Sequence, residues 1–218
     1  MIHMIRGVIF DLDGVLVSTD ELHYEAWKRL AKEIGIAAFG KADNEKQRGV
    51  SRMESLQIVL NKGNKSYTEE EKQGMAERKN NYYKEMLETL DDKAVLPGVL
   101  TTLRGLQDKK ILMAVGSASK NAPSILKRIG LLPYLDGVSS GLDTTRSKPD
   151  PEVFLVAADK LGLSPDKCLV VEDSFAGVQA AKAAGMKSLG VGPYYKELQA
   201  DYEVRSLESE IDWEKILG

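Results

Sequence analysis

The sequence contains a single cysteine, Cys168, so the chain cannot form an internal disulfide bond. It has no apolar run that approaches the roughly 20 residues needed for a membrane-spanning helix. The opening segment, residues 1–6, is too short for a secretory signal. We therefore expect a cytoplasmic protein with no membrane partner. Because Cys168 lies within an apolar run, we expect it to pack in the core rather than to react.

Basic residues are not gathered into a block, and the net charge is only −3. Since nucleic-acid-binding proteins usually present a basic patch, we expect no nucleic-acid partner. No G-x-G-x-x-G motif follows the first apolar run, which disfavours a dinucleotide-binding module. With 218 residues, 43% of them hydrophobic, the chain can bury a substantial core as one domain or as a domain with an insertion. No obvious apolar interface points to assembly, so we expect a monomer.

Short apolar runs that are typical of buried strands alternate with helical patterns along much of the chain. The runs cover residues 8–10, 111–115, 168–171 and 188–191. Strands that alternate with helices indicate an α/β fold with a parallel sheet covered on both faces. In such folds, ligands bind beyond the carboxyl ends of the strands. The residues that follow each apolar run are therefore the first candidates for a functional site.

Residues 19–92 differ from the rest because they contain no convincing strand. Amphipathic helical patterns cover residues 21–34, 51–60 and 68–90. We therefore predict a helical cap domain at 19–92, inserted into an α/β core domain made of residues 1–18 and 93–218. Lids of this kind close over a site and exclude water.

Two of these helical patterns begin with a capping box. Ser51 is followed by Glu54, and Thr68 by Glu71. At this spacing each side chain can accept a hydrogen bond from the other residue's free backbone N–H. The two boxes predict where these helices begin.

Two aspartates follow the first apolar run, in the segment GVIFDLDGVLVST. Because Asp11 and Asp13 are two residues apart, their side chains leave the same face of an extended chain, about 7 Å apart along the strand. One carboxylate can attack an electrophile or bind a metal ion while its neighbour moves a proton. A lone D-x-D-G is equally typical of a turn at a strand end, so the other motifs decide between the two interpretations.

Three further motifs follow apolar runs or precede a helix. Ser117 lies in GSASKN, where a hydroxyl and backbone N–H groups could hold an oxyanion, although such a loop alone is more often a helix start. Lys148 lies in SKPDP, where Pro149 fixes the backbone as a helix begins, although a lone Lys-Pro is usually a surface feature. Glu172 and Asp173 end the third apolar run and add two carboxylates to the rim of the predicted sheet.

The four carboxylates would form a dense negative cluster if the sheet brought Asp11, Asp13, Glu172 and Asp173 together. Unit charges about 4 Å apart repel by about 4 kcal/mol at an effective dielectric constant of roughly 20. Hard oxygen ligands favour Mg²⁺, which keeps waters and accepts phosphate oxygens, and Lys148 would add a second positive charge. An aspartate nucleophile, a hydroxyl group, a lysine and Mg²⁺ together suit phosphoryl transfer to a carboxylate.

Four features of the sequence, taken in order, resemble the four motifs of the haloacid dehalogenase superfamily. They are the Asp-Leu-Asp-Gly that begins at Asp11, then Ser117, then Lys148, and the Glu-Asp-Ser that begins at Glu172. Each motif is weak alone, but the four in order are specific. The resemblance implies a Rossmann-like parallel-sheet core with a helical cap inserted after the first motif. Further stretches resemble the hexose-phosphate mutases of this superfamily: LHYEAWKRLAKEIGI, RGVSRMESLQ, ERKNNYY, GSASKN, SKPDPEVF and VEDSFAGVQAAKAAG.

The resemblance implies a role for each core motif. Asp11 would be the nucleophile that becomes an aspartyl phosphate, and also a Mg²⁺ ligand. Asp13 would be the general acid/base and would bind the metal through its backbone carbonyl. The remaining residues implied are the metal ligands Glu172 and Asp173 and the residues that bind the transferring phosphoryl group, Ser117, Ala118 and Lys148.

The resemblance also implies a second site, for the sugar and the non-transferring phosphate. A planar guanidinium such as that of Arg52 matches phosphate oxygens. Without the resemblance, Arg52 would be read as a solvated residue in the first turn of a helix, His23 as a helix-face residue and Trp27 as part of the core. The residues implied for this site are Thr19, His23, Trp27, Gly49, Arg52, Ser55, Lys79, Ser119, Lys120 and Asn121.

The implied activity converts β-D-glucose 1-phosphate into glucose 6-phosphate through a phosphorylated Asp11 and β-glucose 1,6-bisphosphate. The main alternative is a sugar-phosphate or phosphoglycolate phosphatase, because the four core motifs do not separate a mutase from a hydrolase. A receiver-like signalling protein would share the acidic cluster and the lysine, but would have no use for Asp13 or a lid. Two features depart from the superfamily pattern: Ser18 replaces an expected acidic residue, and residues 139–146 match poorly.

Overall fold

The computed structural model describes residues 4–47 and 50–218. The described chain divides into two compact units: an α/β unit, made of residues up to Ser18 together with Asp91–Gly218, and a helical unit, Thr19–Leu90. The second boundary falls two residues before the one that we expected from the sequence. Asp91 belongs to the α/β unit because its carboxylate caps the 3₁₀ turn Asp92–Ala94, where Ala94 accepts a hydrogen bond from the backbone N–H of Ser18.

The α/β unit contains a six-stranded parallel sheet in the order β3-β2-β1-β4-β5-β6. This confirms the predicted α/β fold. The strands are β1 (Gly7–Phe10), β2 (Leu112–Gly116), β3 (Gly137–Ser139), β4 (Cys168–Glu172), β5 (Lys187–Gly190) and β6 (Tyr202–Glu203). The four predicted strands are present with ends shifted by one residue at most. β1 is buried throughout, as its continuous apolar sequence indicates for a central parallel strand.

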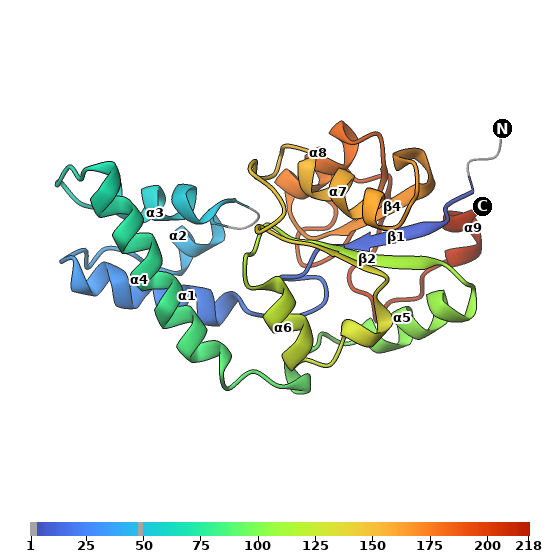
Figure 1. Cartoon of the computed structure of the whole chain (residues 1–218), viewed down its shortest axis with the longest axis horizontal. Helices are drawn as coiled ribbons and strands as arrows, with labels where there is room; N and C mark the ends of the chain where they lie inside the picture. Colours follow the sequence, from blue (N-terminus) through green and yellow to red (C-terminus); the bar gives the residue numbers. More distant parts are fainter. Residues whose placement is uncertain (1–3, 48–49) are drawn as a thin grey trace. The chain divides into compact units, whose positions relative to one another are not determined.

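Helices cover both faces of the sheet in this unit. In Figure 1, α7 and α8 lie on one side of the strands and α5 on the other. Ile9, Phe154 and Val170 belong to the buried core on the first side. The helices are α5 (Val99–Asp108), α6 (Ala122–Arg128), α7 (Glu152–Lys160), α8 (Phe175–Ala183) and α9 (Trp213–Leu217), with 3₁₀ turns at Asp92–Ala94, Leu132–Tyr134 and Pro165–Lys167.

The helical unit has no strand among its described residues. Its helices are α1 (Asp20–Glu33), α2 (Lys41–Glu45), α3 (Arg52–Leu60) and α4 (Glu69–Leu87). Trp27, Leu30, Leu56 and Val59 form the centre of a separate apolar core. In the described parts of both units, none of the helices combines the length and the apolarity that crossing a membrane requires.

Both predicted capping boxes are confirmed. The hydroxyl oxygen of Ser51 accepts the Glu54 N–H at 3.2 Å, and the Glu54 carboxylate accepts the Ser51 N–H at 2.8 Å. Thr68 and Glu71 make the same pair of bonds at 3.2 and 2.7 Å. Each pair satisfies two backbone donors that a helix start otherwise leaves open.

The register of the sheet decides which side chains meet at its carboxyl edge. Phe10 on β1 lies opposite Val115 on β2 and Val171 on β4. The next residues along these strands, Asp11 and Glu172, therefore lie side by side, and Ser117 follows the end of β2. The candidate catalytic side chains meet at this edge because the neighbouring apolar strands end at matching positions.

Candidate active site

A buried lysine joins two of the predicted carboxylates at this edge. The Lys148 Nζ atom donates to Asp11 Oδ1 and, at 2.7 Å, to Glu172 Oε1. The side chains of Lys148 and Glu172 are each 1% exposed, and that of Asp11 is 10% exposed. The structure thus brings together residues 137 positions apart in the sequence.

Burial sets the protonation behaviour of this cluster. It raises the pKa of Asp11 to about 7, because the charged carboxylate loses its water; Lys148 lowers that pKa, whereas Glu172 and Asp13 raise it. Burial also lowers the pKa of Lys148, but the Asp11 and Glu172 carboxylates outweigh burial and raise it above its ordinary value. The lysine therefore stays charged, and Asp11 retains an excess of negative neighbours.

The second oxygen of Glu172 is held by the start of α8. Glu172 Oε2 accepts the Ser174 N–H at 2.7 Å and the Ser174 hydroxyl at 2.9 Å, while Ser174 Oγ accepts the Gly177 N–H at 3.1 Å. A Cβ atom on Gly177 would lie 1.7 Å from Glu172 Oε1. The sequence reasoning missed Ser174 and Gly177 as supports, although their place at the start of a helix after a strand was visible.

The turn after Asp11 places another carboxylate against the backbone. Gly14 has φ +86°, and a Cβ atom there would lie 2.1 Å from Asp173 Oδ2. The Gly14 N–H donates to Val17 O at 2.8 Å, which closes the turn directly after Asp13. Glycine is needed here both for its left-handed backbone and for the close approach of Asp173.

The donor set of this edge fits a hard divalent cation, since it offers four carboxylates and one balancing ammonium group. Across the part of the chain that the structure describes, however, no three His, Cys, Asp or Glu side chains are already arranged as metal ligands. Lys148 instead bridges Asp11 and Glu172. The metal-binding roles of Asp11, Asp13, Glu172 and Asp173 therefore stay predictions.

The loop after β2 is ordered by its own hydroxyl groups. The Ser117 N–H donates to Ser139 O at 3.0 Å, and Ser117 Oγ accepts the Ser119 N–H at 3.1 Å. Ser119 Oγ in turn accepts the Asn121 N–H at 3.2 Å. Because Ser117 Oγ already accepts, its proton remains available for an anion. Ser117 and Asn121 are buried, and Lys120 is exposed.

Phe154 on α7 lies beneath the buried lysine. Its ring centroid is 4.7 Å from Lys148 Nζ, a cation–π distance. A Cβ atom on Gly116 would lie 2.7 Å from the same ring, so Gly116 gives Phe154 its space. No role at this site was predicted for Phe154 from the sequence.

The helical unit contains a cationic cluster of its own. Lys79 is only 3% exposed, and its Nζ atom lies 2.8 Å from His23 Nδ1. That Nζ atom is 4.7 Å from the Trp27 ring centroid and 4.8 Å from the Tyr83 ring centroid. The His23 and Tyr83 rings stack with centroids 4.1 Å apart. Tyr83 was not predicted from the sequence.

Charge and burial make His23 a neutral imidazole. Burial, Lys79 and Arg52 all hold its pKa well below the ordinary value. Since an ammonium group can only donate, His23 Nδ1 accepts from Lys79 and its Nε2 atom carries the proton. Burial also lowers the pKa of Arg52. The structure therefore brings His23, Trp27, Lys79 and Arg52 into one region of this unit.

For the other residues expected to bind the sugar and the distal phosphate, the structure gives burial and backbone hydrogen bonds. Thr19 is buried at the start of α1, and its carbonyl accepts the His23 N–H at 3.0 Å. Ser55 is buried in α3, and its carbonyl accepts from Gln47 Nε2 at 2.9 Å. Gly49 lies outside the described residues. The ligand contacts expected of these residues stay predictions.

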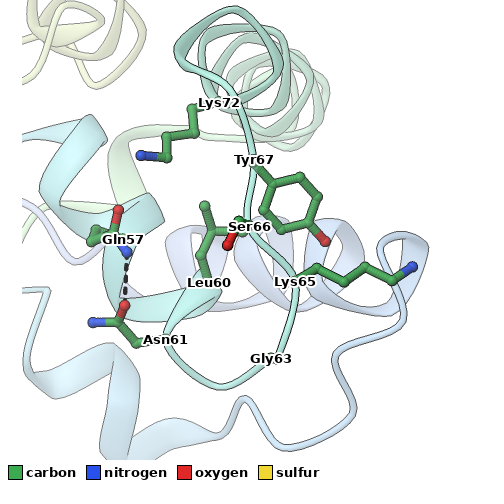
Figure 2. Close-up of a pocket in the computed structure, with 8 residues that line it drawn as sticks. All are labelled: Gln57, Leu60, Asn61, Gly63, Lys65, Ser66, Tyr67 and Lys72. Atoms are coloured by element: carbon green, nitrogen blue, oxygen red, sulfur yellow. Dashed lines mark hydrogen bonds between the residues drawn. The ribbon is translucent and has the colours of Figure 1, made fainter.

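The helical unit also has a surface hollow between the end of α3 and the start of α4. Figure 2 shows the bond from Gln57 Nε2 to Asn61 Oδ1, 2.7 Å long, at one side of the hollow, with Lys65 extending away from it. None of the predicted site residues lines this hollow, which is formed by Gln57, Leu60, Asn61, Gly63, Lys65, Ser66, Tyr67 and Lys72.

Comparison with known proteins identifies the family. Residues 5–185 match the family described as haloacid dehalogenase-like hydrolase. The chain is 40% identical to a β-phosphoglucomutase of Bacillus subtilis over 92% of this chain and 89% of that protein. A crystal structure of β-phosphoglucomutase from Clostridium difficile is also 40% identical, with a TM-score of 0.90 over 98% of this chain and 96% of that one. A phosphorylated carbohydrates phosphatase of Thermotoga maritima is 32% identical over 84% of this chain and 83% of that protein. The sequence motifs, the fold and these comparisons agree, and the chain belongs to the haloacid dehalogenase-like hydrolase family.

Proposed function

We propose that this protein is a β-phosphoglucomutase, an isomerase that interconverts β-D-glucose 1-phosphate and D-glucose 6-phosphate. The observation that carries this proposal is the 40% identity to a β-phosphoglucomutase along 92% of the chain. The buried cluster of Asp11, Lys148 and Glu172 supports it, because a carboxylate beside a fixed positive charge suits phosphoryl transfer.

In the proposed cycle, phosphorylated Asp11 gives its phosphoryl group to the free hydroxyl of the bound glucose phosphate. The bond between phosphorus and the Asp11 oxygen breaks, a bond to the sugar oxygen forms, and Asp13 takes the hydroxyl proton. The product is β-glucose 1,6-bisphosphate, which turns round and returns its other phosphate to Asp11. Asp13 then gives the proton back to the departing sugar oxygen, so that the enzyme is restored.

The other residues of the α/β unit would stabilise the transferring group. Lys148 would place its ammonium against the phosphoryl oxygens, and Ser117 would donate its hydroxyl proton to them. The backbone of Ala118 would contribute a further contact. These roles fit the buried positions of Lys148 and Ser117.

We propose Mg²⁺ as the cofactor. Asp11, Glu172 and Asp173 would hold it through carboxylate oxygens, and Asp13 through its backbone carbonyl. When bound, the ion neutralises the carboxylate cluster and the charge on the phosphoryl oxygens. The support is the group of carboxylates at this edge: burial raises the pKa of Asp11 to about 7, and Glu172 and Asp13 add to that rise although Lys148 opposes it.

The helical unit would bind the sugar and the second phosphate. Arg52 would pair with the non-transferring phosphate, while the neutral His23 would donate from Nε2 to a sugar oxygen. A mutase needs such a site because its bisphosphate intermediate must bind in two orientations. Ser119, Lys120 and Asn121 would help to hold this phosphate, and Thr19, Trp27, Gly49, Ser55 and Lys79 would help to define the sugar site.

A phosphatase acting on sugar phosphates is the second candidate, because the 32% identical relative from Thermotoga maritima is a phosphorylated carbohydrates phosphatase. A hydrolase would use the same Asp11 and Asp13, but would pass the phosphoryl group to water. Product analysis separates the two functions.

The test supplies the protein with Mg²⁺, β-glucose 1-phosphate and a trace of β-glucose 1,6-bisphosphate, and then follows glucose 6-phosphate and free phosphate. The proposal predicts glucose 6-phosphate as the main product. Free phosphate as the main product would instead support the hydrolase.

Arg52→Ala sharpens the same test, with Arg78→Ala as its control. Arg78 lies on α4, is 46% exposed and pairs with Glu33, so its loss removes a similar charge outside the proposed site. Arg52→Ala should impair mutase turnover far more than hydrolysis of a small acyl phosphate, and Arg78→Ala should change neither. Equal losses in both reactions for Arg52→Ala would count against a distal phosphate site.

We also propose that the protein acts as a monomer in the cytoplasm, where hexose phosphates are metabolised.

A further inference from the structure

The segment that leads to Lys148 is one of the two places where the sequence departs from the superfamily pattern. It connects β3 to α7, and its residues 139–146 match poorly. Lys148 must nevertheless reach between Asp11 and Glu172 with its side chain buried. Something in this segment has to fix the backbone that aims the lysine.

Glu152, the first residue of α7, binds this backbone directly. Glu152 Oε2 accepts the Thr145 N–H at 3.0 Å and the Arg146 N–H at 2.7 Å. The Thr145 hydroxyl lies 3.3 Å from both oxygens of the same carboxylate. The Glu152 side chain is 22% exposed, and Thr145 and Arg146 lie at the surface.

These bonds close a ring of eight residues around the lysine. Arg146 precedes Lys148 by two positions, and Glu152 follows it by four. Within the ring, Asp150 Oδ1 accepts the Glu152 N–H at 3.0 Å, and the Asp150 N–H donates to Ser147 O at 2.9 Å. Phe154 follows Glu152 by two positions, and the centroid of its aromatic ring lies 4.7 Å from Lys148 Nζ.

The charge distribution agrees with this arrangement. The backbone N–H groups of Arg146 and Thr145 and the Arg146 side chain hold the pKa of Glu152 below its ordinary value, so the carboxylate remains an acceptor. Arg146 Nη1 also pairs with Asp150 Oδ2 at 3.0 Å, but its side chain is 66% exposed. The backbone bonds are therefore the stronger constraint, since exposed ion pairs contribute little.

The farther half of the connection has a separate anchor. Asp143 Oδ2 accepts the Ser140 N–H at 2.8 Å, and Asp143 Oδ1 pairs with Lys160 Nζ at 2.7 Å. This anchor lies five residues before Lys148. Glu152 is thus the carboxylate that restrains the stretch next to the lysine.

We propose that Glu152 is a positioning residue for phosphoryl transfer, which holds the Thr145–Arg146 backbone so that Lys148 points between Asp11 and Glu172. The proposal rests on the proposed phosphoryl transfer at Asp11, but not on whether sugar or water accepts the group. Glu152 does not touch the substrate in this scheme. Its effect passes entirely through Lys148.

The first experiment times the phosphorylation of Asp11 by acetyl phosphate with Mg²⁺ in a single turnover. Because displacement of a catalytic group by about 1 Å can cost about a hundredfold in rate, Glu152→Ala should slow this step by about ten- to a hundredfold. Asp159→Ala removes a carboxylate from an exposed position on the same helix and should leave the rate unchanged. Equal rates for the two variants would overturn the proposal.

The second experiment separates positioning from general loss of structure. In a Lys148→Ala background, Glu152→Ala should cause no further loss, because the group that it positions is gone. A loss of the same factor in both backgrounds would mean that Glu152 acts on the fold and would overturn the proposal. Single-turnover incorporation can be followed for hours, so a slow background remains measurable.

Glu152→Gln covers the case in which Glu152→Ala does not fold. The amide keeps the shape and one oxygen acceptor for the Arg146 N–H, so this variant should fold, with a rate between those of the wild type and the alanine variant. A Gln variant as fast as the wild type would contradict a role for the charged, multiply bonded carboxylate. If the wild type released only free phosphate, the mutase proposal would fail, while the Glu152 comparison would still be decided.

Discussion

At the scale of single residues, the edge of the sheet depends on one ammonium group shared by two carboxylates. Lys148 is buried with Asp11 and Glu172, and an unpaired charge in such a place would be strongly destabilising. Ser174 holds the far oxygen of Glu172, so the carboxylate that meets Lys148 is fixed from both ends. The precision of the site therefore comes from residues that perform no chemistry themselves.

Gly177 is one such residue, and it can be tested against a matched glycine. Gly177→Ala would place a Cβ atom 1.7 Å from Glu172 Oε1, whereas Gly105→Ala on α5 meets nothing within 4 Å. We expect Gly105→Ala to raise the free energy of unfolding by about 0.5–1 kcal/mol, because alanine suits a helix better than glycine. Gly177→Ala should lower it by about 1–3 kcal/mol, because Glu172 must move.

Urea unfolding and the rate of Asp11 phosphorylation together measure this pair. Gly177→Ala should also slow phosphorylation, while Gly105→Ala should not. A Gly177→Ala protein as stable and as fast as Gly105→Ala would show that Glu172 does not need its present position.

The residues at strand ends could be predicted because their signal is local. Asp11, Ser117 and Glu172 follow apolar runs, and a parallel sheet gathers the ends of its strands at one edge. Ser174, Gly177 and Phe154 could not be assigned their support of the site, although each lies within six residues of its partner, because the backbone turn that brings the two together exists only in the folded chain. Tyr83 was missed for the same reason, since it meets His23 across two helices.

At the scale of elements, the helices and strands with a clear sequence pattern could be predicted, and the shortest strands could not. The long helices of the helical unit have an amphipathic periodicity, and the four predicted strands are continuous apolar runs; both lie close to where the sequence placed them. β3 has three residues and β6 has two, too few for alternation to appear. The predicted helix at 68–90 ends at Leu87, because residues 88–90 form a final turn instead.

The capping box of α4 gives a test at this scale. Thr68→Ala removes the acceptor for the Glu71 N–H and should destabilise the first turn of α4 by about 1 kcal/mol. Amide hydrogen exchange in that turn should then be faster by about fivefold. Thr68→Ser keeps the hydroxyl and should exchange at nearly the wild-type rate. Unchanged exchange in Thr68→Ala would show that the box contributes nothing to the start of the helix.

At the scale of the whole molecule, the chain builds two units with separate cores, and each has its own cluster of charged groups. The α/β unit has an acidic edge with one buried lysine, and the helical unit has Lys79 and Arg52 beside a neutral histidine. The absence of strand patterns in residues 19–92, together with three amphipathic helical patterns, predicted a helical insertion. The end of that insertion lies at Leu90 in the structure because Asp91 already caps the first turn of the second α/β segment.

The central claim is that the carboxylate after β1 carries the phosphoryl group between substrates. The most direct measurement incubates the whole protein with Mg²⁺ and β-glucose 1,6-bisphosphate, quenches it in acid and maps the phosphate by mass spectrometry of its peptides. We predict that the phosphate is found on Asp11 and that no label appears in Asp11→Asn. Phosphate on any other residue, or an Asp11→Asn protein that is still labelled, would contradict the account.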